Sequence, residues 1–166
     1  MRAATIFMIF ASLLLGAAIF GFFYAWVCST MWGLDAADPR VAIAAMQAMN
    51  ASVRNIVFFP PFFLTPLAMA ITAALLARRQ RGPAIAFAVG ALIYLLGGLI
   101  LTITINVPMN EALALTAIPD DAGAATDIWR AYSERWQFWN QTRTLASGLA
   151  FLAAAFGTFL IDRRAL

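Results

Sequence analysis

The sequence contains no histidine, no lysine and a single cysteine, Cys28, among its 166 residues. Without histidine there can be no Ser-His-Asp triad, no His-ligated haem and none of the usual zinc, copper or non-haem iron sites. One cysteine also allows no disulfide within the chain. We therefore expect neither a metal centre nor a bound cofactor.

Charged residues are scarce as well. They make up 11% of the chain, and 63% of the residues are hydrophobic, whereas soluble domains carry about 25% charged residues. These values predict an integral membrane protein with one domain, residues 1–166. The pI near 9.8 does not indicate nucleic-acid binding, because the arginines fall between apolar segments and not along one soluble face. The expected partners of the chain are membrane lipids.

Four segments are long and apolar enough to cross the roughly 30 Å of hydrocarbon that about 20 residues can span. They are residues 4–28, 56–77, 84–105 and 144–161. Each span must be helical, because lipid offers no hydrogen bonds to the backbone. The sequence therefore predicts an all-α, four-helix transmembrane bundle. The first apolar run is too long for a cleaved signal peptide, and prolines interrupt the second.

Arginine placement predicts the orientation of these spans. Six arginines would lie on one side of the membrane: Arg2, Arg78, Arg79, Arg81, Arg163 and Arg164. We expect that side to be the cytoplasm of a bacterium, with both chain ends inside and the two long loops outside the inner membrane. All five tryptophans lie at or beyond the outer boundary, which is typical of an aromatic belt.

The two long loops carry helix signals. Asp38 and Pro39 form an N-cap and a first helical residue, so a short helix of about 39–50 should pack over the bundle or lie in the interface. After a turn at 119–123, Asp127 is expected to cap a helix over 128–143 that continues into the fourth span. At the end of the third span, Pro108 is expected to disturb the helix.

Polar residues gather at the outer end of the predicted bundle. Three clusters should converge there: Asn50 with Arg54, Asn106 with Asn110 and Glu111, and Asn140 with Arg143. Aromatic residues occur with them on one face of the helix from 128 to 143, namely Trp129, Tyr132, Trp136 and Trp139. Such polar groups are costly at the membrane boundary unless they have partners. This pattern predicts a polar pocket with aromatic walls.

These motifs resemble the anthrone-oxygenase-like family of small four-helix membrane proteins. The resemblance rests on "MQAMN" at 46–50, "NVPMNEAL" at 106–113 and the aromatic-rich stretch from Trp129 to Arg143. It implies oxidation of an anthrone or a related apolar, polycyclic or quinone-like molecule by dioxygen, without metal or flavin.

Residue roles can be assigned on that hypothesis. Glu111 is a candidate general base, and Arg143 with Asn140 can stabilise a developing oxyanion. The candidate substrate-binding residues are Asn50, Arg54, Asn106, Asn110, Trp129, Tyr132, Trp136 and Trp139. Arg54 and Arg143 are both possible partners of Glu111. The alternatives are a structural ion pair between Glu111 and Arg143, helix termination at Asn106, Pro108 and Asn110, and ordinary helix packing for the aromatic residues.

Other functions are compatible with the same sequence. The chain can be a non-catalytic accessory subunit or a lipid- or quinone-binding module of a larger membrane complex, or it can form a homo-oligomer through its alanine-rich helices. A transporter is disfavoured, because no charged residue lies at the middle of a span. A copper(I) site of Met31, Met46, Met49 and Met109 is conceivable, but methionine more often fills gaps in packing.

Overall fold

The computed structural model describes residues 2–162, and these are helical with no strand. The α-helices are α1 (Arg2–Ala25), α2 (Met31–Asp35), α3 (Pro39–Ser52), α4 (Phe59–Leu76), α5 (Arg81–Tyr94), α6 (Val107–Ala114) and α7 (Ala122–Phe159). Three π-helical segments join some of them: η1 (Trp26–Thr30), η2 (Leu95–Ile100) and η3 (Thr102–Asn106). The all-α prediction, with an extra short helix and a long last helix, is confirmed.

Three helices are long and apolar enough to cross a membrane: the run Arg2–Asp35, α4, and the run Arg81–Ala114. They make the chain a membrane protein. The fourth predicted span, 144–161, forms no separate helix, because it is the C-terminal part of the 38-residue α7. The first half of α7 is rich in polar residues and extends the helix well beyond this apolar part.

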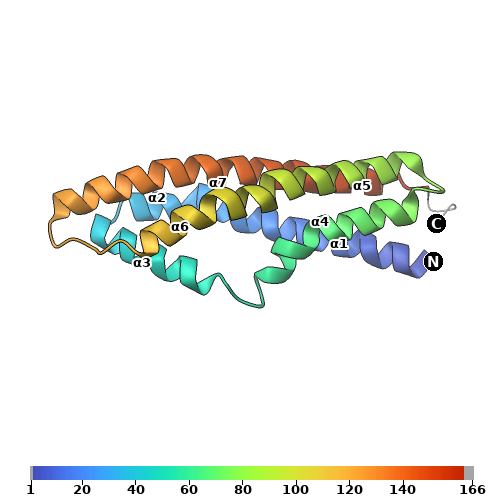
Figure 1. Cartoon of the computed structure of the whole chain (residues 1–166). Helices are drawn as coiled ribbons and strands as arrows, with labels where there is room; N and C mark the ends of the chain where they lie inside the picture. Colours follow the sequence, from blue (N-terminus) through green and yellow to red (C-terminus); the bar gives the residue numbers. More distant parts are fainter. Residues whose placement is uncertain (1, 163–166) are drawn as a thin grey trace.

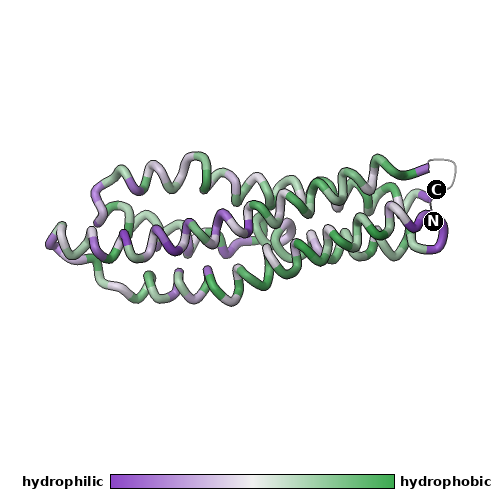
Figure 2. The backbone as a smooth tube through the Cα atoms, turned by 90° about the horizontal axis from the view of Figure 1, so that it is seen from above, coloured by the Kyte–Doolittle hydropathy of each residue, from purple (hydrophilic) through white to green (hydrophobic). Residues whose placement is uncertain are grey.

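The long helices pack side by side in a closed ring. α1 contacts α4 and α7, and α5 contacts the same two helices from the other side. Figure 1 shows that the chain ends, α4 and α5 lie in one half of the elongated molecule, whereas α2, α3 and α6 lie in the other. We call these the terminal half and the distal half. Figure 2 shows hydrophobic residues along the terminal half and recurrent hydrophilic ones in the distal half.

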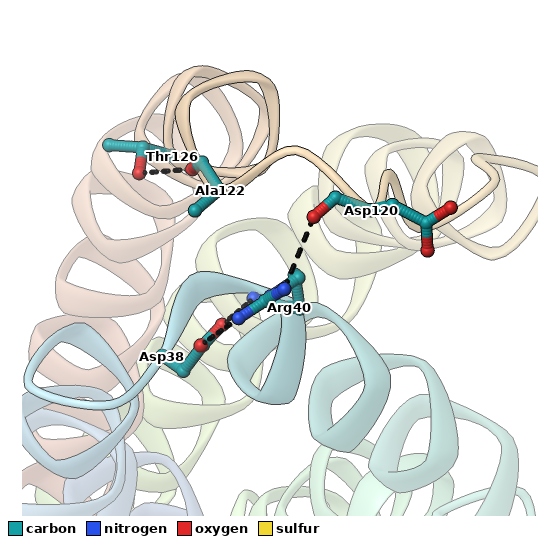
Figure 3. A network of polar contacts seen from close by, with 5 residues as sticks. All are labelled: Asp38, Arg40, Asp120, Ala122 and Thr126. Atoms are coloured by element: carbon teal, nitrogen blue, oxygen red, sulfur yellow. Dashed lines mark hydrogen bonds and ion pairs between the residues drawn. The ribbon is translucent and has the colours of Figure 1, made fainter.

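The short helix α3 confirms the predicted N-cap. The Asp38 side chain accepts a hydrogen bond from the backbone N–H of Arg40, and Pro39 occupies the first helical position. The Arg40 side chain pairs with Asp38 at 2.6 Å and also donates to the backbone oxygen of Asp120, 3.1 Å away (Figure 3). Arg40 therefore ties the start of α3 to the loop that precedes α7. α3 packs against α6 and α7, over the bundle.

The predicted start of the last helix was wrong. α7 begins at Ala122, and its N-cap is Asp121, whose carboxylate accepts from the backbone N–H of Ala124 at 2.8 Å. Asp127 lies inside the helix. The reason is local: the alanine-rich stretch after Asp121 has high helix propensity, and the single Gly123 does not prevent the helix from starting there.

The second predicted span began three residues too early. Residues 56–58 form a turn, because the side-chain oxygen of Asn55 accepts from the backbone N–H groups of Val57 and Phe58. α4 then starts at Phe59, with Pro60 and Pro61 in its first turn. Proline is tolerated there, because the first backbone N–H groups of a helix have no partner within it.

The third predicted span continues well past its predicted end at residue 105. Two π-helical segments, η2 and η3, follow α5, and the helix then runs on through Pro108 to Ala114. Pro108 lies in the first turn of α6, directly after the wide π turn. π-helical turns insert an extra residue and reorient the side chains that follow, and they are frequent at functional sites.

Candidate functional site

A cavity of about 250 Å³ lies where the terminal and distal halves meet. Its lining comes from α1, η1, α3, the α3–α4 loop, α4, η3, α6 and α7. The lining residues are Phe22, Phe23, Trp26, Met49, Asn50, Val53, Arg54, Phe58, Phe59, Phe62, Phe63, Thr102, Ile103, Val107, Asn110, Trp136 and Arg143. Most of this surface is apolar, and a few polar groups converge on it, as in small-molecule sites.

Arg143 is the most constrained polar group of the cavity. Its side chain is 5% exposed, and Nε donates to the Asn140 side-chain oxygen at 3.0 Å. Nη1 lies 3.5 Å from the hydroxyl oxygen of Thr102. The guanidinium carbon lies 4.6 Å from the ring centroid of Phe23 and 4.8 Å from that of Trp136. Contact with the ring faces stabilises the positive charge.

No carboxylate pairs with this arginine in the part of the chain that the structure describes. Asn140, the residue that orients it, is buried and does not line the cavity. The Asn140 side-chain nitrogen donates to the backbone oxygen of Phe23 at 3.3 Å, which fixes the oxygen toward Arg143. Asn140 is therefore a positioning residue, whereas Arg143 faces the cavity directly.

Asn110 organises a second polar group of the lining. Its side-chain oxygen accepts from the hydroxyl of Tyr132 at 2.8 Å and from the indole nitrogen of Trp136 at 3.0 Å. The side-chain nitrogen of Asn50 donates to the Tyr132 oxygen at 3.4 Å. Burial raises the pKa of Tyr132 above its usual range, so the phenol stays protonated and acts as a donor and not as a base.

Asn106 does not line the cavity. It is fully buried, and neither its side-chain nitrogen nor its oxygen has a hydrogen-bond partner among the described residues. A buried amide without partners is uncommon and costs free energy. The wide turn of η3, which ends at this residue, holds the side chain in the interior.

Glu111 was predicted to converge with Arg143, but the structure separates them. Its carboxylate lies 3.4 Å from Nη2 of Arg54, and both side chains are more than half exposed. Arg54 lines the cavity, but Glu111 lies in a neighbouring surface hollow. The structure of residues 2–162 therefore contains no ion pair between Glu111 and Arg143, and Glu111 pairs with its other possible partner, Arg54. The hollow that holds Glu111 shares Asn50, Arg54 and Asn110 with the cavity.

The aromatic wall also differs from the prediction. Among the four aromatic residues of α7 that were predicted to form the wall, only Trp136 lines the cavity. Trp129 and Tyr132 belong to a buried cluster with Met31 and Met46, and Trp139 packs against Phe138. The Trp129 indole nitrogen donates to the carboxylate of Asp35 at 2.9 Å.

Trp26 of η1 and six phenylalanines supply the rest of the aromatic wall. The phenylalanines come from α1, from α4 and from the residue before α4: Phe22, Phe23, Phe58, Phe59, Phe62 and Phe63. The sequence analysis did not assign them to the site, although "FFPPFF" at 58–63 groups four of them around two prolines. Asp35 was missed in the same way. It accepts from Trp129, Ser133 and Gln137 and so joins α2 to α7.

Within residues 2–162 the structure brings together no group of three or more histidine, cysteine or acidic residues that could hold a metal ion. The four methionines considered for copper are placed in packing roles: Met31 and Met46 are fully buried in the core of the distal half, and Met49 and Met109 pack against it. The side-chain donors in the cavity lining belong to two asparagines, one threonine, two tryptophans and two arginines.

These features define a helical membrane protein with an aromatic cavity and an arginine in its wall. The sequence profile of the anthrone oxygenase family matches residues 49–153, more than half of the chain, and the protein belongs to this family. The predicted resemblance is confirmed. The matched segment contains the polar lining residues Asn50, Arg54, Asn110 and Arg143. No curated protein and no solved structure matches the chain.

Proposed function

We propose that the protein oxidises an apolar, polycyclic aromatic substrate with dioxygen in this cavity, without a cofactor. The observation that carries the proposal is Arg143, a buried cation that faces an aromatic cavity and has no carboxylate partner among residues 2–162. Membership of the anthrone oxygenase family supports the same chemistry. A fixed cation in a water-poor site is well suited to stabilise negative charge that develops on a substrate oxygen.

The proposed reaction starts with the loss of a proton from the CH₂ group of an anthrone-like ketone. The electrons of that C–H bond form an enolate, and Arg143 stabilises the charge on its oxygen. The enolate carbon transfers an electron to dioxygen, and the resulting radical pair combines to a hydroperoxide after protonation. Loss of water then gives the quinone. One oxygen atom enters the product, the other leaves as water, and the substrate supplies all the reducing electrons.

The proposed proton acceptor is Glu111. No carboxylate lines the cavity, but Arg54, which does, pairs with Glu111 at the rim. The flat substrate would lie between the phenylalanines of α1 and α4 and the Trp136 ring, with its oxygen toward Arg143. Asn50 and Asn110 would face its edge, and Asn140 would keep the guanidinium in position.

The test is turnover of a simple anthrone by the purified protein in detergent and air, followed by anthraquinone absorbance. We expect Arg143→Gln to lower the rate by about a hundredfold, as loss of one oxyanion donor does in other enzymes. Arg135→Gln is the matched control, because Arg135 is an exposed arginine on the same helix. A wild-type rate equal to that of protein-free detergent would overturn the proposal.

Glu111→Gln tests the base separately. We expect it to slow turnover at neutral pH, and we expect higher pH to relieve the defect, because hydroxide then forms the enolate without help. A defect of the same size at every pH would assign Glu111 a structural role through Arg54 and would remove it from the reaction.

We also propose that the terminal half faces the cytoplasm of a bacterial cell, within the inner membrane. Arg78, Arg79 and Arg81 are exposed around the α4–α5 turn of that half, and such clusters are retained on the cytoplasmic side. Arg163 and Arg164 lie outside the described residues. In a Cys28→Ala background, an impermeant maleimide should label Asp127→Cys in spheroplasts, but Arg79→Cys only after lysis. The reverse pattern would invert the topology.

A further inference from the structure

The charges around the cavity do not balance. Its lining contains two arginines and no acidic residue. Arg54 is neutralised by Glu111 from outside the cavity, in an exposed pair. Arg143 is buried and makes no ion pair with any residue in the range 2–162. The closed part of the cavity therefore carries one uncompensated positive charge.

Such a charge is expensive to bury. Removing an ion from water costs several kcal/mol even after the protein relaxes, unless a partner compensates. Two ring faces and two side-chain oxygens offset part of this cost for Arg143. The Nη2 atom of Arg143 donates to no acceptor among the described residues. A guanidinium has five N–H donors, so several of those of Arg143 remain available to a ligand.

The rest of the lining indicates what else the ligand must carry. The rest of the lining is mostly apolar and includes phenylalanines of α1 and α4 as well as Ile103 and Val107. A hydrated inorganic anion gains nothing from such a wall, whereas an apolar body does. The cavity volume of about 250 Å³ restricts that body to a small one.

We infer that the cavity prefers small apolar molecules in their anionic form and binds them with a single carboxylate or phenolate group at Arg143, more tightly than their neutral counterparts. The inference rests on the cavity assigned above as the substrate site, and it adds the charge state of the bound ligand. Affinity is set before any oxidation: the anion pairs with Arg143, and the neutral form of the same molecule leaves the cation uncompensated. Acids that dioxygen cannot oxidise should therefore bind as well.

The experiment compares two probes of nearly equal size and shape, the anion anthracene-2-carboxylate and the neutral anthracene-2-carboxamide. Their binding to the wild-type protein in non-ionic detergent is measured by tryptophan quenching, since Trp136 lines the cavity. We expect the carboxylate to bind about ten-fold more tightly, as charge-assisted hydrogen bonds predict. Equal affinity of the two probes for the folded wild type would overturn the inference.

Variants locate the effect. Arg143→Gln should abolish the preference for the carboxylate, Arg143→Lys should keep part of it, and Arg135→Gln should keep all of it. Since the wild-type comparison needs no variant, a misfolded Arg143→Gln leaves the test intact. If Arg143→Gln preferred the carboxylate as strongly as the wild type does, the inference would also be overturned. Another residue would then recognise the charge.

The source of the acid is tested by competition. Displacement of anthracene-2-carboxylate by dodecanoate, but not by dodecanamide, would show that the site accepts lipid-derived acids; failure of both to displace it would restrict the site to aromatic acids. Both results keep the charge requirement. Because binding is measured without turnover, a protein that binds the carboxylate but oxidises no anthrone would retain this inference and lose the proposed oxygenase function.

Discussion

The two halves of the molecule are held together by different means. In the terminal half, small residues let the helices approach closely: a Cβ added at Gly90 would lie 2.9 Å from the backbone oxygen of Ala150. In the distal half, large side chains with polar ends separate the helices and hydrogen-bond between them, as Trp129 does with Asp35. The cavity lies where the close packing gives way to the wider one, and there the large side chains leave space unfilled.

The site thus lies where two packing regimes meet, and helices supply most of its lining. Lipid-facing helices gain little from the hydrophobic effect when they associate, so close contact of small residues and interhelical hydrogen bonds must replace it. The terminal half relies mainly on the first means, although Ser12 and Thr72 also hydrogen-bond there at 2.9 Å, and the distal half relies mainly on the second. The following substitutions disturb each half in turn, beginning with the largest expected effect.

Gly90→Leu should break the close packing of the terminal half. The new side chain would meet the backbone of α7 at Ala150 and the sulfur of Met69, and a backbone atom cannot move aside cheaply. We expect a loss of about 3 kcal/mol or more, measured as thermal unfolding in detergent. Gly21→Leu is the control, because a Cβ there meets nothing within 4 Å. Equal effects at both positions would mean that close packing does not hold this half together.

Asn110→Leu should weaken the distal half. The substitution leaves the Tyr132 hydroxyl and the Trp136 indole nitrogen without their acceptor. We expect a loss of about 2 kcal/mol, because a buried donor without a partner keeps its desolvation cost. Gln141→Leu is the control, since this amide is exposed on α7. An unchanged melting temperature for Asn110→Leu would show that other groups satisfy both donors.

Asn106→Leu should stabilise the protein, in contrast to the two substitutions above. The asparagine amide is buried with neither atom paired among the described residues, so an apolar side chain of similar size removes a cost. We expect a gain of about 1 kcal/mol in the same unfolding assay. Destabilisation instead would indicate that a bound water satisfies the amide, and that this part of the helix bundle is not dry.

The smallest effect is expected at the outer end of the distal half, where Asp38 and Arg40 pair in the open. The hydrogen bonds from Arg40 hold the pKa of Asp38 at about 2, below its usual value of 3.8. A carboxyl group whose pKa is lower in the folded than in the unfolded protein stabilises the fold at pH values above its unfolded-state pKa. This stabilisation is lost as the pH falls toward the folded-state pKa.

Asp38→Asn keeps the helix cap but cannot titrate. We therefore expect the melting temperature of the wild type to be slightly higher than that of this variant at about pH 5. The difference in melting temperature should shrink as the pH is lowered toward about 2. A difference that stays constant over this range would show that the pair does not contribute through its charge.

Part of the fold could be read from the residues because the signal was local. Asp38 followed by Pro39 starts a helix wherever it occurs, and an apolar run with no charge must be helical in lipid. The errors occurred where two local signals competed. Asp121 and Asp127 are both good caps, and only the alanine-rich stretch between them decides that α7 starts at the first. At Pro108 the π turn lets the helix continue through a residue that usually ends one.

The site was predicted less fully than the fold. Arg143, Asn110 and Trp136 were identified from their unusual position at the edge of apolar segments. Glu111 follows the π-helical segment η3 by five residues, and the sequence pattern did not predict a π turn there. The phenylalanines of α4 were missed because such residues in an apolar span have no property that distinguishes a cavity wall from a lipid-facing surface.

The sequence by itself determined the helical class, the membrane location, the family and the polar residues that needed partners, because burial in lipid penalises each unpaired polar group wherever the chain places it. The tertiary structure decided which partners those residues found. In the folded residues 2–162, Arg143 has no ion-pair partner and Glu111 pairs with Arg54. The reason is that the relative rotation of the helices depends on the packing of small residues in one half and of aromatic rings in the other. That rotation is a property of the whole bundle and not of any one segment.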